Sequence, residues 1–318
     1  MHRRTASRFL LASALLLGLA ACQKSPESVR APEKLQVVAT LFPLYDFART
    51  VGGDRVQVTL LLPPGVESHS YEPRPEDMAR IARSDLFLFT NRFMEPWAGK
   101  LVQGAGNPHL VVVDASSGIR LMPAAAGDRD EHVHAGERAG GSGLDPHVWL
   151  DFTQAQQMVT TIAEALAARD PAGRDRYLAN AAAYREQLAQ LDAAYREGLA
   201  ACRSRTLLLG GHAAFGYLAR RYGLRTVAAY ALGADAEPTP RRMLELVRQL
   251  RESGAQAIYA EELLSPRVAE TIGRETGARV LPLHAAHNVG REDLQQGVTF
   301  LALMERNLQN LREGLACR

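Results

Sequence analysis

Several histidines of this chain follow predicted strands, and imidazole is a common ligand of transition metals. Four of them lie where a strand or loop ends before a helix: His69, His147, His212 and His284. Ligands of open parallel sheets bind at the carboxyl ends of the strands, so two facing sheets would bring these side chains together. Four imidazole nitrogens at about 2.0–2.1 Å from the ion make a closed tetrahedral zinc site, which suits carrying a metal rather than catalysis.

Two other interpretations of these histidines compete with a carrier site. A single histidine after a strand is commonly a surface or capping residue, and spacing alone leaves that interpretation open. Three histidines with a bound water could instead form a zinc hydrolase site. No H-E-x-x-H motif occurs in the sequence, and no general base accompanies the histidines, so we expect that the chain is not an enzyme.

The elements that must position these residues alternate twice between short apolar strands and helical periods. The expected strands of the first half cover residues 36–40, 56–62, 85–89 and 110–113. Those of the second half cover residues 206–209, 226–230, 257–260 and 279–283. This alternation predicts an α/β fold of two similar lobes, each a four-stranded, mostly parallel sheet flanked by helices.

One long helix is predicted between the two lobes. Residues 173–200 carry apolar side chains at spacings of three and four, over a length of roughly 40 Å. We therefore expect a rigid backbone helix that joins an N-terminal lobe, residues 35–168, to a C-terminal lobe, residues 201–318. A final helix is expected over residues 292–313.

Residues 124–143 interrupt the pattern with acidic residues, glycines and two histidines, His132 and His134. This composition predicts a surface loop. Its histidines could act as an auxiliary site that captures or senses zinc weakly, or the loop could be a solvated segment with no effect on affinity.

The first 21 residues predict a signal peptide. Three arginines precede an apolar stretch that is too short to span a bilayer, and small residues then lead to Cys22. The segment resembles the start of bacterial lipoproteins, in which that cysteine is acylated and begins the mature protein. We expect Cys22 to anchor the chain to a membrane, on its periplasmic or cell-surface side, through a tether over residues 22–34. An ordinary cleaved signal with an incidental cysteine is the alternative.

Only Cys202 and Cys317 remain beyond Cys22. Two cysteines in an oxidising compartment are expected to pair as a disulfide, and metal ligation by free thiols is the weaker interpretation. The net charge of +2 over 318 residues gives no indication of nucleic-acid binding.

Four segments together resemble the metal-binding lipoproteins of ABC transporters, the zinc and manganese solute-binding proteins of the ZnuA/TroA type. The resemblance covers nearly all of residues 35–317. The segments are T-L-F-P-L-Y at residues 40–45, L-P-P-G with H-S-Y-E-P at residues 62–73, D-P-H-V-W-L at residues 145–150, and G-H-A-A-F-G-Y at residues 211–217.

The resemblance implies that His69, His147 and His212 are nitrogen ligands of the metal. Manganese members usually have a carboxylate at the place of His212, and imidazole suits zinc better than Mn²⁺. The implied ion is therefore Zn²⁺, with Mn²⁺ as the alternative.

The fourth ligand departs from the family pattern, which offers an aspartate shortly after the last strand. Here the sequence reads L-H-A-A-H-N from residue 283. His284 matches best by position and His287 is the runner-up, while a carboxylate from elsewhere or a water could also complete the shell.

The implied function is high-affinity extracytoplasmic binding of zinc and its delivery to an ABC-type uptake permease. No G-x-x-x-x-G-K-[ST] motif occurs, so the ATPase must be a separate chain. We expect a monomer. A manganese- or iron-binding member of the family, or a surface adhesin, are the alternatives.

Overall fold

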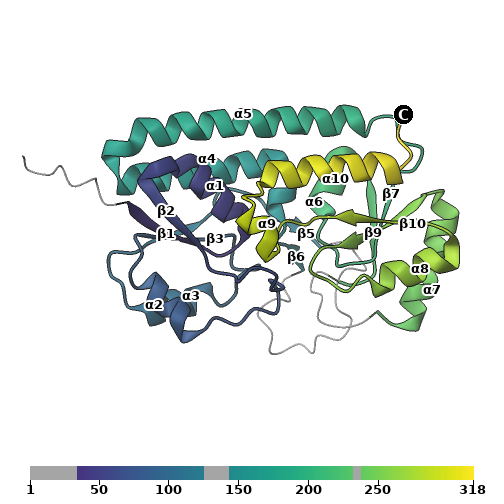
Figure 1. Ribbon diagram of the computed structural model, residues 1–318, viewed down its shortest axis with the longest axis horizontal. Coiled ribbons are helices and arrows are strands. Elements are labelled where there is room, and N and C mark those ends of the chain that lie inside the picture. The colour runs from purple at the N-terminus through teal and green to yellow at the C-terminus, as the bar shows by residue number, and fades with distance from the viewer. Residues whose placement is uncertain (1–33, 125–142, 232–237) are drawn as a thin grey trace, which may run out of the picture. The chain divides into compact units, whose positions relative to one another are not determined.

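A computed structural model describes residues 34–124, 143–231 and 238–318 (Figure 1). The predicted signal peptide, Cys22, all of its tether except Lys34, and His132 and His134 lie outside the described residues. Within the described ranges, no helix combines the length and apolar character that crossing a membrane requires.

The first sheet contains four parallel strands in the order β2-β1-β3-β4. The strands are β1 (Leu35–Ala39), β2 (Val56–Leu60), β3 (Leu86–Phe89) and β4 (Val111–Asp114). The helices between them are α1 (Phe42–Gly52), α2 (Pro75–Ile81) and α3 (Ala98–Ala105). Proline in the first turn of α1 and α2 suits a helix start. The N–H that proline lacks would have no hydrogen-bond partner within the helix at that position.

The second sheet repeats this arrangement with the order β10-β9-β7-β8, again parallel. Its strands are β7 (Thr206–Leu209), β8 (Arg225–Ala228), β9 (Ala257–Glu261) and β10 (Arg279–Leu283). The helices between them are α6 (Gly216–Tyr222), α7 (Pro240–Ser253) and α8 (Arg267–Thr276). The predicted fold class of two four-stranded parallel sheets with flanking helices is therefore confirmed.

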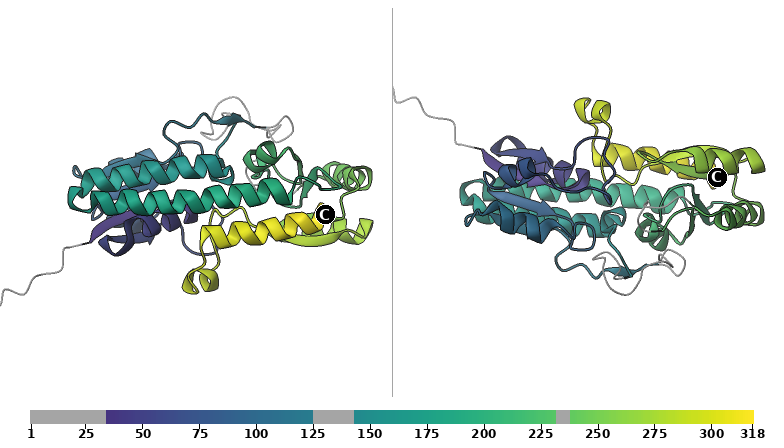
Figure 2. Two further views of the ribbon diagram at one scale, coloured as in Figure 1. Left: turned by 90° about the horizontal axis from the view of Figure 1, so that it is seen from above. Right: turned by 90° about the horizontal axis from the view of Figure 1, so that it is seen from below.

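Two adjoining helices run along one side of the sheets, α4 (Phe152–Arg169) and the 25-residue α5 (Arg174–Gly198), as Figure 2 shows. The buried side chains of α5 form the predicted stripe: Tyr177, Ala181, Tyr184, Leu188, Leu191 and Tyr195. This helix also contacts α1 and α10 (Phe300–Gly314), so it packs against elements from both ends of the chain.

The predicted final helix is divided into α9 (Arg291–Gln295) and α10. Gly297 adopts a φ of 72°, a left-handed conformation that glycine enters without strain. The Thr299 side chain then accepts a hydrogen bond from the Ala302 N–H and caps α10. The prediction of one helix over residues 292–313 was therefore wrong at this break.

One continuous hydrophobic core extends beneath both sheets. It includes Leu86 and Leu88 of the first sheet, Leu207 and Leu209 of the second, and the fully buried Trp149 between them. The buried carboxylate of Asp46 adds a polar connection, because it accepts hydrogen bonds from the Tyr184 hydroxyl and the Phe300 N–H. A shared core makes a wide separation of the two halves costly, since separation would expose apolar surface.

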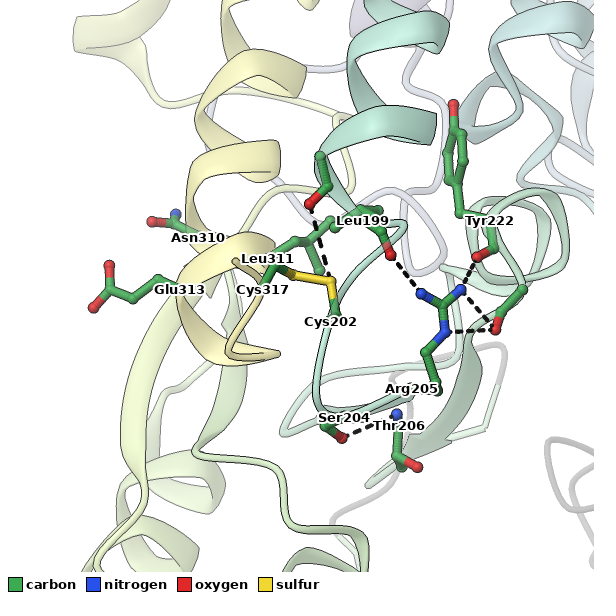
Figure 3. The surroundings of a disulfide bond; sticks show 12 residues. Leu199, Cys202, Ser204, Arg205, Thr206, Tyr222, Asn310, Leu311, Glu313 and Cys317 are labelled. Atoms are coloured by element: carbon green, nitrogen blue, oxygen red, sulfur yellow. Dashed lines mark hydrogen bonds between the residues drawn. A yellow bond between two sulfur atoms is a disulfide. The ribbon is translucent and has the colours of Figure 1, made fainter.

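A disulfide joins Cys202, just after α5, to Cys317, just after α10 (Figure 3). Beside it, the guanidinium of Arg205 donates hydrogen bonds to the carbonyl oxygens of Leu199, Tyr222 and Gly223. The bond closes a loop of sequence separation 115 and fastens the chain terminus to the end of the long helix.

Candidate metal centre

Four histidines from four separate loops converge at the carboxyl ends of the two sheets: His69, His147, His212 and His287. One ring nitrogen from each lies within 4.8 Å of those of the others. His69 lies in the loop after β2, and His212 and His287 follow β7 and β10. His147 lies between the short strand β6 (Leu144–Asp145) and the 3₁₀ turn η2 (Val148–Leu150).

Two of the distances between ring nitrogens have the length expected for tetrahedral zinc coordination. The Nε2 atom of His147 lies 3.3 Å from that of His69 and 3.3 Å from that of His212. Four nitrogens at about 2.0–2.1 Å from a zinc ion lie roughly 3.3–3.4 Å apart. The nitrogen-to-nitrogen distances are therefore those of two edges of a zinc tetrahedron.

Asp145 determines which nitrogen of His147 faces the centre. Its Oδ1 accepts a hydrogen bond from the His147 backbone N–H at 2.9 Å and lies 2.8 Å from the His147 Nδ1. Because a carboxylate only accepts, the proton resides on Nδ1 and the lone pair of Nε2 faces the other imidazoles. The cap of α4 comes from Asp151, whose side chain accepts from the Thr153 N–H, so Asp145 serves the histidine.

Glu261 has the same relation to His212. Its Oε2 lies 2.6 Å from the His212 Nδ1 and accepts from the His212 backbone N–H at 3.1 Å. Sequence reasoning missed this residue, although Glu261 and Glu262 directly follow the predicted strand at residues 257–260. Ligands of open parallel sheets bind at the carboxyl ends of the strands, and this strand-end rule points to these carboxylates as well as to the histidines.

The loop that bears His69 is braced by Glu67. The Glu67 carboxylate accepts hydrogen bonds from the backbone N–H groups of His69, at 3.0 Å, and Ser70, at 2.8 Å. This local turn sets the direction of the His69 side chain, which is half-buried, whereas the other three histidines of the group are buried.

The two histidines after β10 occupy different places. His287 is 5% exposed, and its Nε2 is a buried atom without a hydrogen-bond partner. His284 is not a member of the four-histidine group; its Nδ1 lies 2.7 Å from the Glu262 carboxylate. Ala286 between them has a φ of 62°, which reverses the backbone and turns the two rings in different directions. Geometry thus places the runner-up, His287, beside the three predicted ligands.

The turn that carries His287 is attached to three other segments. The Phe42 N–H donates to the His287 carbonyl at 2.9 Å, and the Trp149 indole donates to the Ala285 carbonyl at 2.8 Å. The Asn288 amide donates to the carbonyls of Pro63 and Val66 in the loop that bears His69. Hydrogen bonds between separate loops therefore help to hold the four histidines in place, in addition to the contacts within each loop.

The buried surroundings keep most of these imidazoles neutral. Burial lowers the pKa of His69, His147 and His287 well below its ordinary value. Burial also lowers the pKa of His212, but the negative charge of Glu261 beside it prevails, and the net pKa is raised. Burial raises the pKa of Asp145 to about 7. Neutral imidazoles with inward lone pairs are ready to bind a cation without first losing protons, with the exception of His212.

We expect metal affinity to decrease as the pH falls from about 7.5 to about 5.5, by up to roughly tenfold per pH unit. The metal binds the unprotonated ring, and the raised pKa of His212 means that a proton competes with the ion in this range. Isothermal titration in two buffers of different ionisation enthalpy would measure both the affinity and the proton released. A constant affinity across this range, with circular dichroism showing an intact fold, would contradict the assignment of His212.

Comparison with known proteins identifies relatives that bind zinc. The family model described as zinc-uptake complex component A, periplasmic, matches residues 37–314. The zinc-binding lipoprotein AdcA of Streptococcus pneumoniae strain R6 is 36% identical over 96% of this chain, which spans 60% of that protein's length. The high-affinity zinc uptake system protein ZnuA of Bacillus subtilis strain 168 is 34% identical, over 99% of both chains.

Solved structures show the same fold. The Zn(II)-bound ZnuA-like domain of the pneumococcal AdcA has a TM-score of 0.75 and 34% identity, over 89% of this chain and 99% of that one. The laminin-binding protein Lmb of Streptococcus agalactiae, described as a bifunctional protein with adhesin and metal-transporting activity, has a TM-score of 0.77 and 29% identity, over 89% and 100%. The match across residues 37–314, together with the relative matched along its whole length, shows that this chain belongs to the ZnuA family, the periplasmic A component of zinc-uptake complexes.

Proposed function

We propose that this chain binds one Zn²⁺ ion outside the cytoplasm with His69, His147, His212 and His287, and delivers it to an ABC-type uptake permease. The proposal rests on one observation above the others. The Nε2 atoms of His147 and His212 face each other at 3.3 Å while both Nδ1 atoms are directed at carboxylates. Two ring nitrogens at that distance need a proton or a metal ion between them, and the presence of two further imidazoles within reach supports a metal ion.

Imidazole ligands favour zinc over manganese. Mn²⁺ prefers carboxylate and other oxygen ligands, whereas neutral imidazole suits Zn²⁺. The names of the two sequence relatives, a zinc-binding lipoprotein and a zinc uptake protein, support the same ion. Zinc is here the cargo, and the chain is a transport component rather than an enzyme, in agreement with its family.

The family acts outside the cytoplasm as part of a transporter. For this chain we assign a lipid anchor at Cys22, in keeping with the lipoprotein name of the pneumococcal relative. A monomeric carrier would then diffuse along the membrane to its permease, whose ATPase is a separate chain. This chain spans 60% of that relative's length, so the activity of the whole relative is not assigned to it.

The test is the metal content and metal preference of the purified chain. We expect about one zinc per chain without added metal, and at least a 100-fold preference for Zn²⁺ over Mn²⁺ in competition titrations, because imidazole ligands disfavour the harder ion. Mass spectrometry of the bound metal and a chelator competition assay give the two values. Equal or tighter binding of Mn²⁺ would contradict the proposal.

Adhesion is a second candidate function, favoured by the similarity to the laminin-binding protein Lmb. Metal binding would persist in an adhesin, so only a partner-binding assay distinguishes the two. Saturable binding of the purified chain to immobilised laminin would support adhesion, whereas binding no greater than to albumin would contradict adhesion to laminin.

A further inference from the structure

The ligand set proposed above contains four neutral imidazoles and no carboxylate. A divalent ion among neutral ligands leaves an uncompensated charge of +2 in a buried place, which is electrostatically costly. Negative charge that offsets the charge of the ion must therefore come from groups that contact the ligands and not the ion itself. Glu261 is the carboxylate that contacts two of those ligands.

Glu261 lies between His212 and His287. Its Oε2 is 2.6 Å from the His212 Nδ1, and its Oε1 is 3.9 Å from the His287 Nδ1. The Glu261 side chain is only 6% exposed, so its charge is weakly screened by water. One buried carboxylate therefore lies beside the Nδ1 atoms of two rings of the four-histidine group.

Gly211 provides the space for this carboxylate. A Cβ atom built at Gly211 would lie 2.4 Å from the Glu261 Oε2 and 2.7 Å from the Glu261 Cβ, closer than atoms can approach. The same relation recurs in the same motif, where a Cβ at Gly216 would lie 2.6 Å from the Asp145 Oδ2. Two glycines of the G-G-H-A-A-F-G segment thus lie against the two carboxylates that orient His212 and His147.

We infer that Glu261 is a positioning residue of the zinc site, which fixes the Nδ1–H form of His212 and supplies the negative charge that an all-histidine ligand set lacks. The inference rests on the proposed zinc-binding function. A carboxylate hydrogen-bonded to Nδ1 holds the ring in one orientation, and it makes Nε2 a stronger donor to the metal. The second carboxylate oxygen extends the same charge to His287.

The test compares two substitutions at this position. Glu261→Gln keeps an acceptor for the His212 Nδ1–H but removes the charge, and Glu261→Ala removes both. We expect zinc affinity to fall about 10-fold in the first and about 100-fold in the second, the range found when outer groups of metal sites are removed. Glu245→Gln is the matched control, because it removes a charge that pairs with Arg242 on the surface of α7, and it should stay within twofold of the unaltered chain.

Spectroscopy separates positioning from a general loss of stability. With Co²⁺ in place of zinc, the unaltered chain and Glu261→Gln should both give the intense visible bands of tetrahedral cobalt. Glu261→Ala should give weaker, shifted bands, because the His212 ring is no longer held. Proton–nitrogen correlation spectra of the zinc-loaded chain should show His212 protonated at Nδ1 and lose that signature in Glu261→Ala.

Gly211→Ala provides an independent variant that removes no polar group. Its methyl group displaces the Glu261 carboxylate, so zinc affinity should fall as in Glu261→Ala. Zinc affinities of both Glu261 variants within twofold of the unaltered chain, with the cobalt spectrum unchanged, would overturn the inference. If the unaltered chain itself binds no zinc, the proposed function fails instead, and the two failures are thereby distinguished.

Discussion

Replacing His287 with alanine should reduce zinc affinity by about 100-fold or more, whereas replacing His284 should reduce it less than about tenfold. A closed zinc site contributes roughly 10–16 kcal/mol through four ligands, or about 3 kcal/mol for each. The His287 ring lies 4.9–5.4 Å, centroid to centroid, from the other three rings and has a buried, unpartnered Nε2. His284 is instead paired with Glu262 outside the group. Chelator competition at neutral pH measures both affinities on the same scale.

The His284 variant is a matched control for the His287 variant, because both remove an imidazole from the same turn. His147→Ala provides the positive reference, since His147 is completely buried and its Nε2 lies 3.3 Å from two other ring nitrogens. A larger loss in His284→Ala than in His287→Ala would restore His284 as the fourth ligand. Unchanged affinity in both variants would remove each of them from the ligand set.

Loss of the disulfide should produce the largest effect on stability. The double variant Cys202→Ser/Cys317→Ser opens a loop of sequence separation 115. In the chain-entropy model this costs about 5 kcal/mol, which corresponds to a decrease in Tm of about 10 °C or more. The double variant is preferable to either single one, because a single substitution leaves a free thiol.

Zinc affinity should change little in the same double variant. The disulfide lies next to the segment that enters β7, where the Ser204 N–H donates to the Leu315 carbonyl, whereas His212 follows the opposite end of that strand. Differential scanning calorimetry of the double variant, and of the unaltered chain after reduction, measures the stability change. An unchanged Tm under both conditions would show that the bond does not stabilise the fold.

The strand-end rule accounts for most of what the sequence could predict. His69 and His212 follow strands, and parallel strands place their carboxyl ends at one edge of a sheet, so convergence follows from topology. The alternation of strands and helices in both halves also predicts the two parallel sheets. The stripe of α5 was predictable residue by residue, because helical periodicity is a strong signal in a long helix.

The choice between His284 and His287 was not available from the sequence. It depends on the left-handed conformation of Ala286, and alanine gives no sign of a positive φ, unlike glycine or asparagine. The turn adopts this conformation because Phe42, Trp149 and the Asn288 amide hold it through bonds to distant segments. Interactions between loops of different halves cannot be derived from local pattern.

Two other features were present in the sequence and were misread or overlooked. Gly297 followed by Thr299 is a helix stop followed by a helix start, which the apolar periodicity of residues 292–313 concealed. Glu261 also lies at a strand end, where the sequence marks a carboxylate that can orient a neighbouring histidine. Both signals are local ones: a glycine followed by a helix-capping threonine, and a carboxylate at the end of a strand.

The hydrogen bonds that hold the His287 turn should also affect how long a bound ion stays in the site. Affinity differences between related sites arise mostly from dissociation rates, and a closed tetrahedral site releases its ion only after one ligand withdraws. Moving His287 by backbone motion breaks the bond from Phe42 and disturbs the two that Asn288 makes, so the ion should dwell long in the isolated carrier. A membrane partner that rearranges the loop at Pro63 and Val66 would shorten that dwell without parting the shared core. If the four histidines bind the ion as proposed, its residence time should therefore depend on the contacts between the His69 loop and the His287 turn.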